Sequence, residues 1–340
     1  MFVVRPARPA DLDAIERMAR ATDPMLHSLP PDRELLRARI DASVMSFGTE
    51  VVFPGEESYL LVLEDTDTGR LHGTGRIVAT AGSTGPFAVY RNDVIIQASR
   101  ELKLHSRVHA LTLSHELSGH TQLGGFYVDR EATGAGLPAL LSRARLLLAL
   151  QHPERFHDEL VSVLPGVSDD AGRSPFWDAL GGRFFRMAFR QAEFLSGARD
   201  KTFIAEMMPH HPIYVPLLPE DAQRVMGQAH PRSRLPLEIL SDEGFEGDRF
   251  IDLFDGGPVL CARRALTRSA REGFARPARR GMPPADATRW HLAATGGDAN
   301  DFRCLLLRLP ETPPDELVVP AAAADLLDLR PGASLRCVPL

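Results

Sequence analysis

The clearest hydrophobic pattern in the chain lies in its leucine-rich middle. Over residues 137–150, apolar side chains recur every three or four positions, which predicts a helix with one apolar face against a sheet. The preceding stretch, residues 125–128, is uncharged and carries aromatic and β-branched side chains, so it predicts a short buried strand. Gly134 and Gly136 separate the strand from the helix in a Gly-x-Gly turn.

A strand, a glycine turn and a helix together aim free backbone N–H groups at an anion such as pyrophosphate. Arg130, Arg143 and Arg145 would add side-chain charge. A tight connection without a ligand is the other interpretation, because glycine serves wherever the backbone turns sharply. The third glycine of a dinucleotide fold and the Gly-Lys-Ser/Thr of a phosphate loop are absent. The turn resembles that of the acyl-CoA N-acyltransferase superfamily, Arg/Gln-x-x-Gly-x-Gly/Ala, with acidic Glu131 as a departure.

The pattern before this unit predicts a strand, two helices and a hairpin, which is the element order of that superfamily. These segments are residues 2–5, 11–21, 31–47, 58–64 and 71–81. A long insertion, residues 82–122, follows the hairpin and contains strand-like runs at 93–99 and 109–114. After residue 150 we expect a helix starting at Ser174 and strands at 160–164, 202–208 and 248–254.

Residues 263–280 hold seven arginines and one acid, Glu272. A solvated linker and a basic loop over an acidic substrate are the two interpretations, and the linker is favoured. The short β runs beyond it (304–309, 316–319 and 334–338), with a helix at 321–327, predict a small β-barrel-like tail. The expected fold is α+β: an acyl-CoA N-acyltransferase-like mixed sheet flanked by helices over 1–258, a linker or loop region at 259–300, and a small β-rich C-terminal domain at 301–340, or already from 259.

Composition narrows the classes of protein that fit. The 340 residues are 44% hydrophobic and can bury a large core, while a net charge of −6 argues against nucleic-acid binding. We find no signal peptide and no apolar run of the roughly 18 residues that span a bilayer. Three widely spaced cysteines form neither a disulfide framework nor a zinc cluster. A cytoplasmic protein that does not bind membranes is expected.

The histidines do not predict a metal site. His115, Glu116 and His120 resemble a zinc-protease motif, but the second histidine is five positions on instead of four. No serine elbow or cysteine–histidine frame supports a covalent nucleophile. His230 precedes Pro231 and could act as a general acid or base, or lie on a surface loop. Asp252 and Asp255 could face a cationic substrate or only form a turn.

Longer blocks resemble arginine N-succinyltransferase, essentially from end to end. They are residues 28–30, 59 and 62–65, 174–177, 203–209, 211–214, 227–231 and 251–258. The resemblance implies transfer of a succinyl group from succinyl-CoA, a co-substrate, to L-arginine, giving N2-succinyl-L-arginine and CoA, with no permanently bound cofactor. It also implies that His230 is the proton donor and that Phe126 contacts succinyl-CoA.

A strand splayed from its neighbour would leave N–H groups near Phe126 and Val128 for the pantetheine, with the phosphates at Gly134 and Gly136. Glu206, Asp252 and Asp255 are candidate partners of the substrate guanidinium. Residues 152–156 and 214–219 look closer to the α type of the paired succinyltransferases. This leaves two alternatives, an ornithine-preferring enzyme and a non-catalytic α-type subunit, and it predicts a homo-oligomer or a hetero-oligomer with a β-type subunit.

Overall fold

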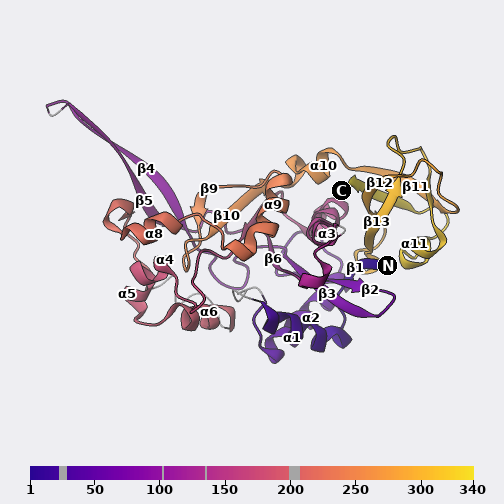
Figure 1. The fold of residues 1–340 in the computed structure, drawn as a ribbon, viewed down its shortest axis with the longest axis horizontal. Helices are drawn as coiled ribbons and strands as arrows, with labels where there is room; N and C mark the ends of the chain where they lie inside the picture. The colour runs from indigo at the N-terminus through magenta and orange to yellow at the C-terminus, as the bar shows by residue number, and fades with distance from the viewer. Residues whose placement is uncertain (23–28, 102, 135, 199–206) are drawn as a thin grey trace.

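One mixed β-sheet runs the length of the molecule in the computed structural model, which describes residues 1–22, 29–101, 103–134, 136–198 and 207–340. Within these residues the strand order is β14-β11-β15-β12-β13-β1-β2-β3-β6-β7-β10-β9-β4-β5-β8. Figure 1 shows the C-terminal strands at one end and the β4–β5 hairpin projecting from the other. The sheet and its helices confirm the α+β, N-acyltransferase-like fold expected from the sequence.

The middle of the sheet contains the predicted N-terminal strands. They are β1 (Phe2–Pro6), β2 (Ser58–Asp65), β3 (Arg70–Val78), β6 (Thr121–Val128) and β7 (Glu159–Val163). The first four pair antiparallel in that order, and β6 and β7 run parallel. Strand β2 is buried on both faces from Ser58 to Leu63, which explains its unbroken apolar sequence.

Helices cover both faces of this central sheet. Helices α1 (Leu12–Ala21) and α2 (Arg33–Gly48) lie on one face, and α3 (Leu137–Gln151) lies on the other (Figure 1). All residues from 140 to 149 are buried, whereas the sequence predicted one apolar face. The helix is enclosed because α9 (Arg234–Asp242) and β12 (Arg289–Thr295) pack on the sides that the sheet leaves open.

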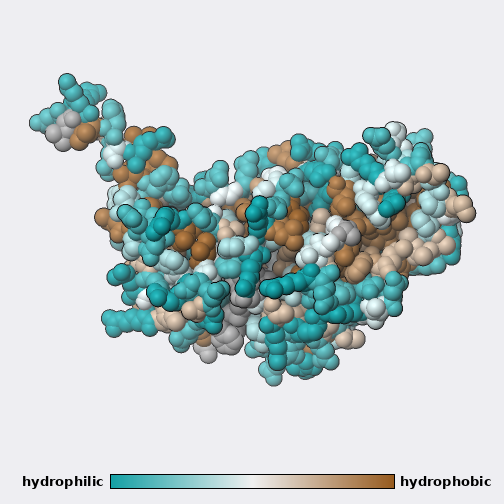
Figure 2. All heavy atoms as spheres, in the orientation of Figure 1, coloured by the Kyte–Doolittle hydropathy of each residue, from teal (hydrophilic) through white to brown (hydrophobic). Residues whose placement is uncertain are grey.

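The insertion forms a long hairpin. Its strands are β4 (Val89–Ser99) and β5 (Leu104–Ser114), both longer than the predicted runs. The base joins the sheet through β9 (Glu246–Ile251) and β8 (Ile213–Tyr214), while the outer half stands clear of the body (Figures 1 and 2). Ile96 and Leu104 on this outer half are 68% and 61% exposed.

Short helices around Trp177 form the lobe beneath the hairpin. They are α4 (Pro175–Ala179), α5 (Gly181–Phe185), α6 (Phe189–Ala198) and α8 (Glu220–Val225). The helix expected at Ser174 is present, with the Ser174 hydroxyl capping it. Of the strand predicted at 202–208, residues 202–206 lie outside the described part of the chain, and Met207 and Met208 are not in a strand. The strand predicted at 248–254 is β9, which ends at Ile251 because Asp252 begins a turn.

The C-terminal region corrects two expectations. Its elements are β10 (Pro258–Arg263), α10 (Arg268–Arg271), β11 (Phe274–Arg280), β13 (Cys304–Leu309), β14 (Leu317–Val319), α11 (Ala321–Leu326) and β15 (Ser334–Pro339). The segment at 259–300 is therefore not a linker: Ala278 is buried, and Arg279 and Arg280 point outward to Glu316 and Asp325. The tail is not a closed barrel either, because β13 pairs with β1 and so continues the main sheet.

Candidate active site

The central sheet opens between β6 and β7. The two strands pair at only three positions, the last of which joins Leu123 to Ser162, and β6 then continues to Val128. At the parting point Gly125 has a φ of +56°, and the pairing of β6 with β3 shifts register between Thr74 and Arg76. A bulge of this kind turns the strand away from its neighbour.

The exposed edge of β6 presents two backbone donors. Asp129 donates its N–H to the His72 carbonyl on the β3 side, at 2.7 Å. Because N–H groups alternate along a strand, those of Phe126 and Val128 point to the other side, where β7 has diverged. Both side chains are partly exposed. Phe126 and Val128 are thus the two residues whose amides face the opening.

The opposite wall carries His230. Beyond β7 the chain turns toward β10, and the Pro165 carbonyl accepts the His230 N–H at 2.8 Å. An isolated bridge between Gly166 and Ala229 holds the two segments together. His230 therefore lies beside the continuation of β7, as the N-cap residue of the 3-10 turn Pro231–Ser233.

The His230 ring is held in one orientation. Its Nδ1 accepts the Arg232 N–H at 3.2 Å, so in the neutral ring the hydrogen lies on Nε2. Burial lowers the pKa of His230 from its ordinary 6.5, and the backbone of Ser168 and the charge of Asp170 oppose this shift. Burial therefore favours the neutral imidazole, and the bond from Arg232 orients its ring.

Asp252 and Asp255 stabilise the turns next to the segment that carries His230. Asp252 accepts the Phe254 N–H at 2.8 Å, and Asp255 accepts those of Gly166 and Gly257 at 2.7 and 2.8 Å. Burial, and next the charge of Asp252, raises the pKa of Asp255 to about 7. Both carboxylates therefore form turns, and Asp255 fixes the segment that carries His230. Glu206, the third acidic candidate, lies outside the described residues.

The glycine turn lies at the start of α3. Gly136, at φ +76°, is the N-cap, and the side chain of Leu340 packs directly on it. Around Gly134 no atom lies within 4 Å of the position that a β-carbon would take. Glu131 forms an ion pair with Arg70 at 3.3 Å, so its negative charge is opposed at the turn. Gly134 is therefore open at the start of the helix, whereas Leu340 covers Gly136.

The arginines of α3 do not add charge to this turn, contrary to the prediction. Arg143 and Arg145 are 3% and 1% exposed. Arg143 pairs with Glu243, and Arg145 donates to Ser142 and to the Gly124 carbonyl. They point into the protein because α3 is enclosed on every side. Arg130, the third, is exposed beside the turn.

One residue beside the opening was missed in the sequence analysis. Arg76 on β3 lies opposite Gly124, the first residue of β6 after its pairing with β7 ends. The sequence does point to this residue, because it is the lone arginine in the otherwise uncharged strand segment Leu-His-Gly-Thr-Gly-Arg-Ile-Val at residues 71–78. A charged residue there is unusual because both faces of the central strands are covered.

An opened strand pair followed by a glycine turn and a helix defines this chain as an acyltransferase of the N-acyltransferase fold. The family model described as "Arginine N-succinyltransferase beta subunit" matches residues 2–269, and that of its C-terminal domain matches residues 275–339. The chain belongs to the arginine N-succinyltransferase family.

Relatives match it along their whole length. Arginine N-succinyltransferase subunit alpha of Pseudomonas aeruginosa is 45% identical over 338 residues, 99% of both chains. An arginine N-succinyltransferase of Salmonella schwarzengrund is 36% identical over 342 residues, 100% of this chain and 98% of the other. The solved structure of arginine/ornithine succinyltransferase subunit AI from Pseudomonas aeruginosa superposes with a TM-score of 0.91 at 43% identity, covering 100% and 98% of the two chains.

Among the described residues, no group of His, Cys, Asp and Glu side chains is arranged to hold a metal ion. None of the helices in the described ranges is both long and apolar enough to cross a bilayer.

Proposed function

We propose that this chain transfers the succinyl group of succinyl-CoA to the α-amine of L-arginine, giving N2-succinyl-L-arginine and CoA in arginine catabolism. The observation that carries the proposal is the opening between β6 and β7, with free strand amides on one wall and His230 on the other. Family membership supports the choice of substrates.

The CoA thioester would lie along the open edge of β6. The Phe126 and Val128 amides would bind the pantetheine and polarise the thioester carbonyl, as an added strand binds a sheet edge. The helix N-terminus at Gly134 and Gly136 would take the pyrophosphate. Burial of the two α3 arginines leaves this task to backbone N–H groups and to Arg130.

The neutral α-amine would attack the thioester carbon directly, forming the amide bond as the carbon–sulfur bond breaks. The proton lost by the attacking nitrogen would pass through His230 to the departing CoA sulfur, so that the amide and the thiol form with no net change in the protonation of the ring. Positioning supplies most of the rate, and acid–base help is worth about 10² to 10⁴. The hydrogen bond from the Arg232 N–H to Nδ1 supports this assignment, because it fixes the orientation of the ring.

The substrate guanidinium needs acidic partners. Asp252, Asp255 and Glu206 remain the proposed set, joined by Glu193, which is 5% exposed and whose pKa is raised to about 8 by burial and by the charges of Asp255 and Asp252. A guanidinium placed beside these acids would relieve their mutual repulsion.

Two alternatives have specific support. The solved relative is named an arginine/ornithine succinyltransferase subunit, which favours ornithine as a second acceptor. The Pseudomonas relative is named subunit alpha, which favours a chain that works with a second subunit, as a homo-oligomer or with a β-type chain. The exposed apolar residues of the β4–β5 hairpin support such an assembly, since an isolated two-stranded hairpin is only marginally stable in water.

The purified single chain, assayed for thiol release with succinyl-CoA and L-arginine, tests the proposal. Release that requires arginine and exceeds the rate with L-ornithine supports it. A higher kcat/KM for ornithine supports the first alternative. No release from the chain alone, but release after a β-type subunit is added, supports the second.

A further inference from the structure

Arg76 occupies the place where the sheet divides. Its cross-strand neighbours are Leu60 on β2 and Gly124 on β6. Gly124 directly follows Leu123, the last residue of β6 that pairs with β7. Because Gly124 has no side chain, β6 places none directly opposite Arg76 at this position.

The side chain of Arg76 points away from α3. A β-carbon on the preceding residue, Gly75, would lie 3.1 Å from Cδ of Arg145 on α3, so Gly75 faces that helix. Successive residues of a strand face opposite sides, which directs Arg76 to the α1–α2 face. Its Nε donates to the Ser58 hydroxyl on that face at 2.8 Å.

The positive charge of Arg76 has no matching acid. Among the described residues, no carboxylate forms an ion pair with it, and its only hydrogen-bond partner is the neutral Ser58. Arg5 shows the contrast: it is buried on β1 and bound by both Asp11 and Glu64. Burial alone lowers the pKa of Arg76 to about 10, as expected for a guanidinium that lacks an anion.

A second guanidinium lies near the first. Arg39 on α2 is also partly buried, and its pKa is lowered to about 9 by burial and then by the charge of Arg76, with Asp32 opposing. An anion that binds at Arg76 would also offset the repulsion between the two guanidinium groups. A carboxylate matches the planar donors of arginine.

We propose that Arg76, with Arg39 beside it, binds the terminal carboxylate of the acyl group of succinyl-CoA. The inference rests on the proposed function and names the residues that select its acyl donor. The thioester would lie on the amides of β6 just past Gly124, and two methylene groups separate its carbonyl from the carboxylate. Arg76 is the charged residue opposite that point. An acyl-CoA without the carboxylate would leave the Arg76 guanidinium without an anion.

Acyl selectivity tests the proposal. Butyryl-CoA has the same chain length as succinyl-CoA, with a methyl group in place of the carboxylate. We expect Arg76→Met to lower the ratio of kcat/KM for succinyl-CoA over butyryl-CoA at least about tenfold, Arg39→Met to lower it less, and Arg76→Lys to retain part of it. Arg37→Met is the matched control for Arg39→Met, because Arg37 also lies on α2 but is exposed. An unchanged ratio in Arg76→Met overturns the proposal.

Two further measurements separate the remaining outcomes. Calorimetric titration with succinyl-CoA, butyryl-CoA and free CoA, without acceptor, should show that only succinyl-CoA binding weakens in Arg76→Met. If this holds while the wild-type chain does not acylate arginine, the proposed function fails and the carboxylate site stands. If Arg76→Met instead impairs the use of arginine but not of argininamide, the site binds the acceptor's carboxylate, and the acyl assignment is overturned.

Discussion

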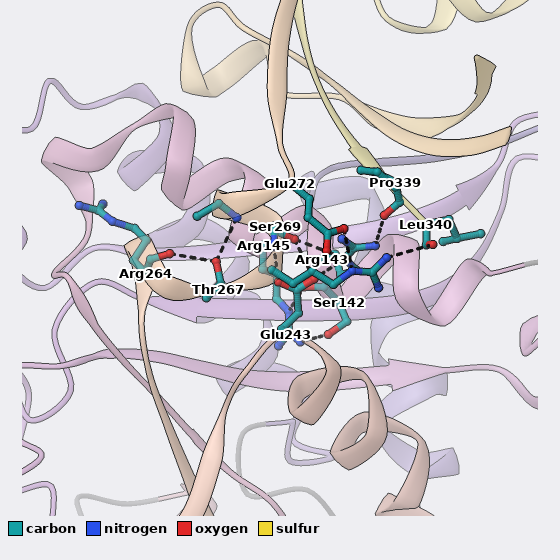
Figure 3. Close-up of polar contacts among 12 residues, drawn as sticks. Ser142, Arg143, Arg145, Glu243, Arg264, Thr267, Ser269, Glu272, Pro339 and Leu340 are labelled. Atoms are coloured by element: carbon teal, nitrogen blue, oxygen red, sulfur yellow. Dashed lines mark hydrogen bonds and ion pairs between the residues drawn. The ribbon is translucent and has the colours of Figure 1, made fainter. Parts of the chain in front are cut away.

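Arg143 on α3 and Glu243, which follows α9, form an ion pair in the interior, with 4% and 1% of their side chains exposed. Ser269 donates both its N–H and its hydroxyl to Glu243, at 2.8 and 2.9 Å. Arg143 also donates to the Pro339 carbonyl at 2.7 Å (Figure 3). The pair therefore ties the helix behind the proposed CoA site to α10 and to the end of β15.

Removing one member of this pair should destabilise the protein strongly. In Glu243→Gln, Arg143 would remain buried without its counter-charge, and the free energy of unfolding should fall by about 3 kcal/mol. Urea unfolding measures the change. Glu246→Gln, at a nearby exposed position on β9, is the control and should stay within about 0.5 kcal/mol of the wild type. Equal stability of the two variants would contradict the structural role of the pair.

His230→Gln should lower kcat at least about tenfold and leave the Kd of CoA nearly unchanged, because the imidazole serves proton transfer and not cofactor binding. Stopped assays of thiol release and calorimetric titration with CoA measure the two effects. His105→Gln, an exposed histidine on the β4–β5 hairpin, is the matched control. Wild-type kcat in His230→Gln would remove His230 from the mechanism.

The pH dependence of kcat/KM should reflect the lowered pKa of His230. Protonation places a hydrogen on Nδ1, which then cannot accept the Arg232 N–H, so the ring loses its orientation. Activity should therefore fall with decreasing pH through a pKa below 6.5. The residual activity of His230→Gln should lack this acid limb. A limb that persists in the variant would belong to another group.

The sequence was sufficient where local pattern decides the structure. The repeat of leucines gives α3, and the unbroken apolar run gives β2. The sequence was not sufficient where the pairing between distant segments decides the structure. A splayed strand near Phe126 was expected, but the residue at which β7 leaves β6, Leu123, depends on a register set across the sheet. The arginines at 276–280 suggest a solvated linker, yet Ala278 faces inward from β11, which pairs with β14 and β15.

The same contrast between local pattern and long-range pairing applies to the candidate active site. Phe126 and His230 followed from the resemblance, and their places on opposite walls of the opening required the fold. Arg143 was misplaced because a sequence cannot show that Glu243, a hundred residues away, neutralises it inside the protein. Arg76 was overlooked because its meaning depends on Gly124 across the strand pair.

Glu193 should make stability depend on pH. Burial, then the charges of Asp255 and Asp252, raises its pKa from 4.5 to about 8. The folded protein then keeps a proton that the unfolded chain releases, so this group's contribution to stability is lost as pH rises from 4.5 to about 8. Glu193→Gln mimics the protonated acid, and its advantage over the wild type should grow between pH 6 and 8 by up to about 1.4 kcal/mol per pH unit. Urea unfolding at both pH values tests this, with exposed Glu238→Gln as the control.

The two glycines of the turn should respond differently to substitution. Around Gly134 there is room for a methyl group, and its φ is not in the left-handed region, so Gly134→Ala should change stability by less than about 0.5 kcal/mol. In Gly136→Ala the φ of +76° strains the backbone and the new methyl group meets Leu340 at 2.7 Å, so stability should fall by about 1 to 2 kcal/mol.

Binding separates their roles further. If pyrophosphate rests on this turn, the methyl group of Gly134→Ala blocks the close approach of the ligand to the backbone, and the Kd of CoA should rise at least about tenfold in a protein of normal stability. The matching ligand control is pantetheine, which lacks the pyrophosphate and should bind both proteins alike. Unchanged CoA binding in Gly134→Ala would place the phosphates elsewhere, because the substitution alters nothing else within 4 Å.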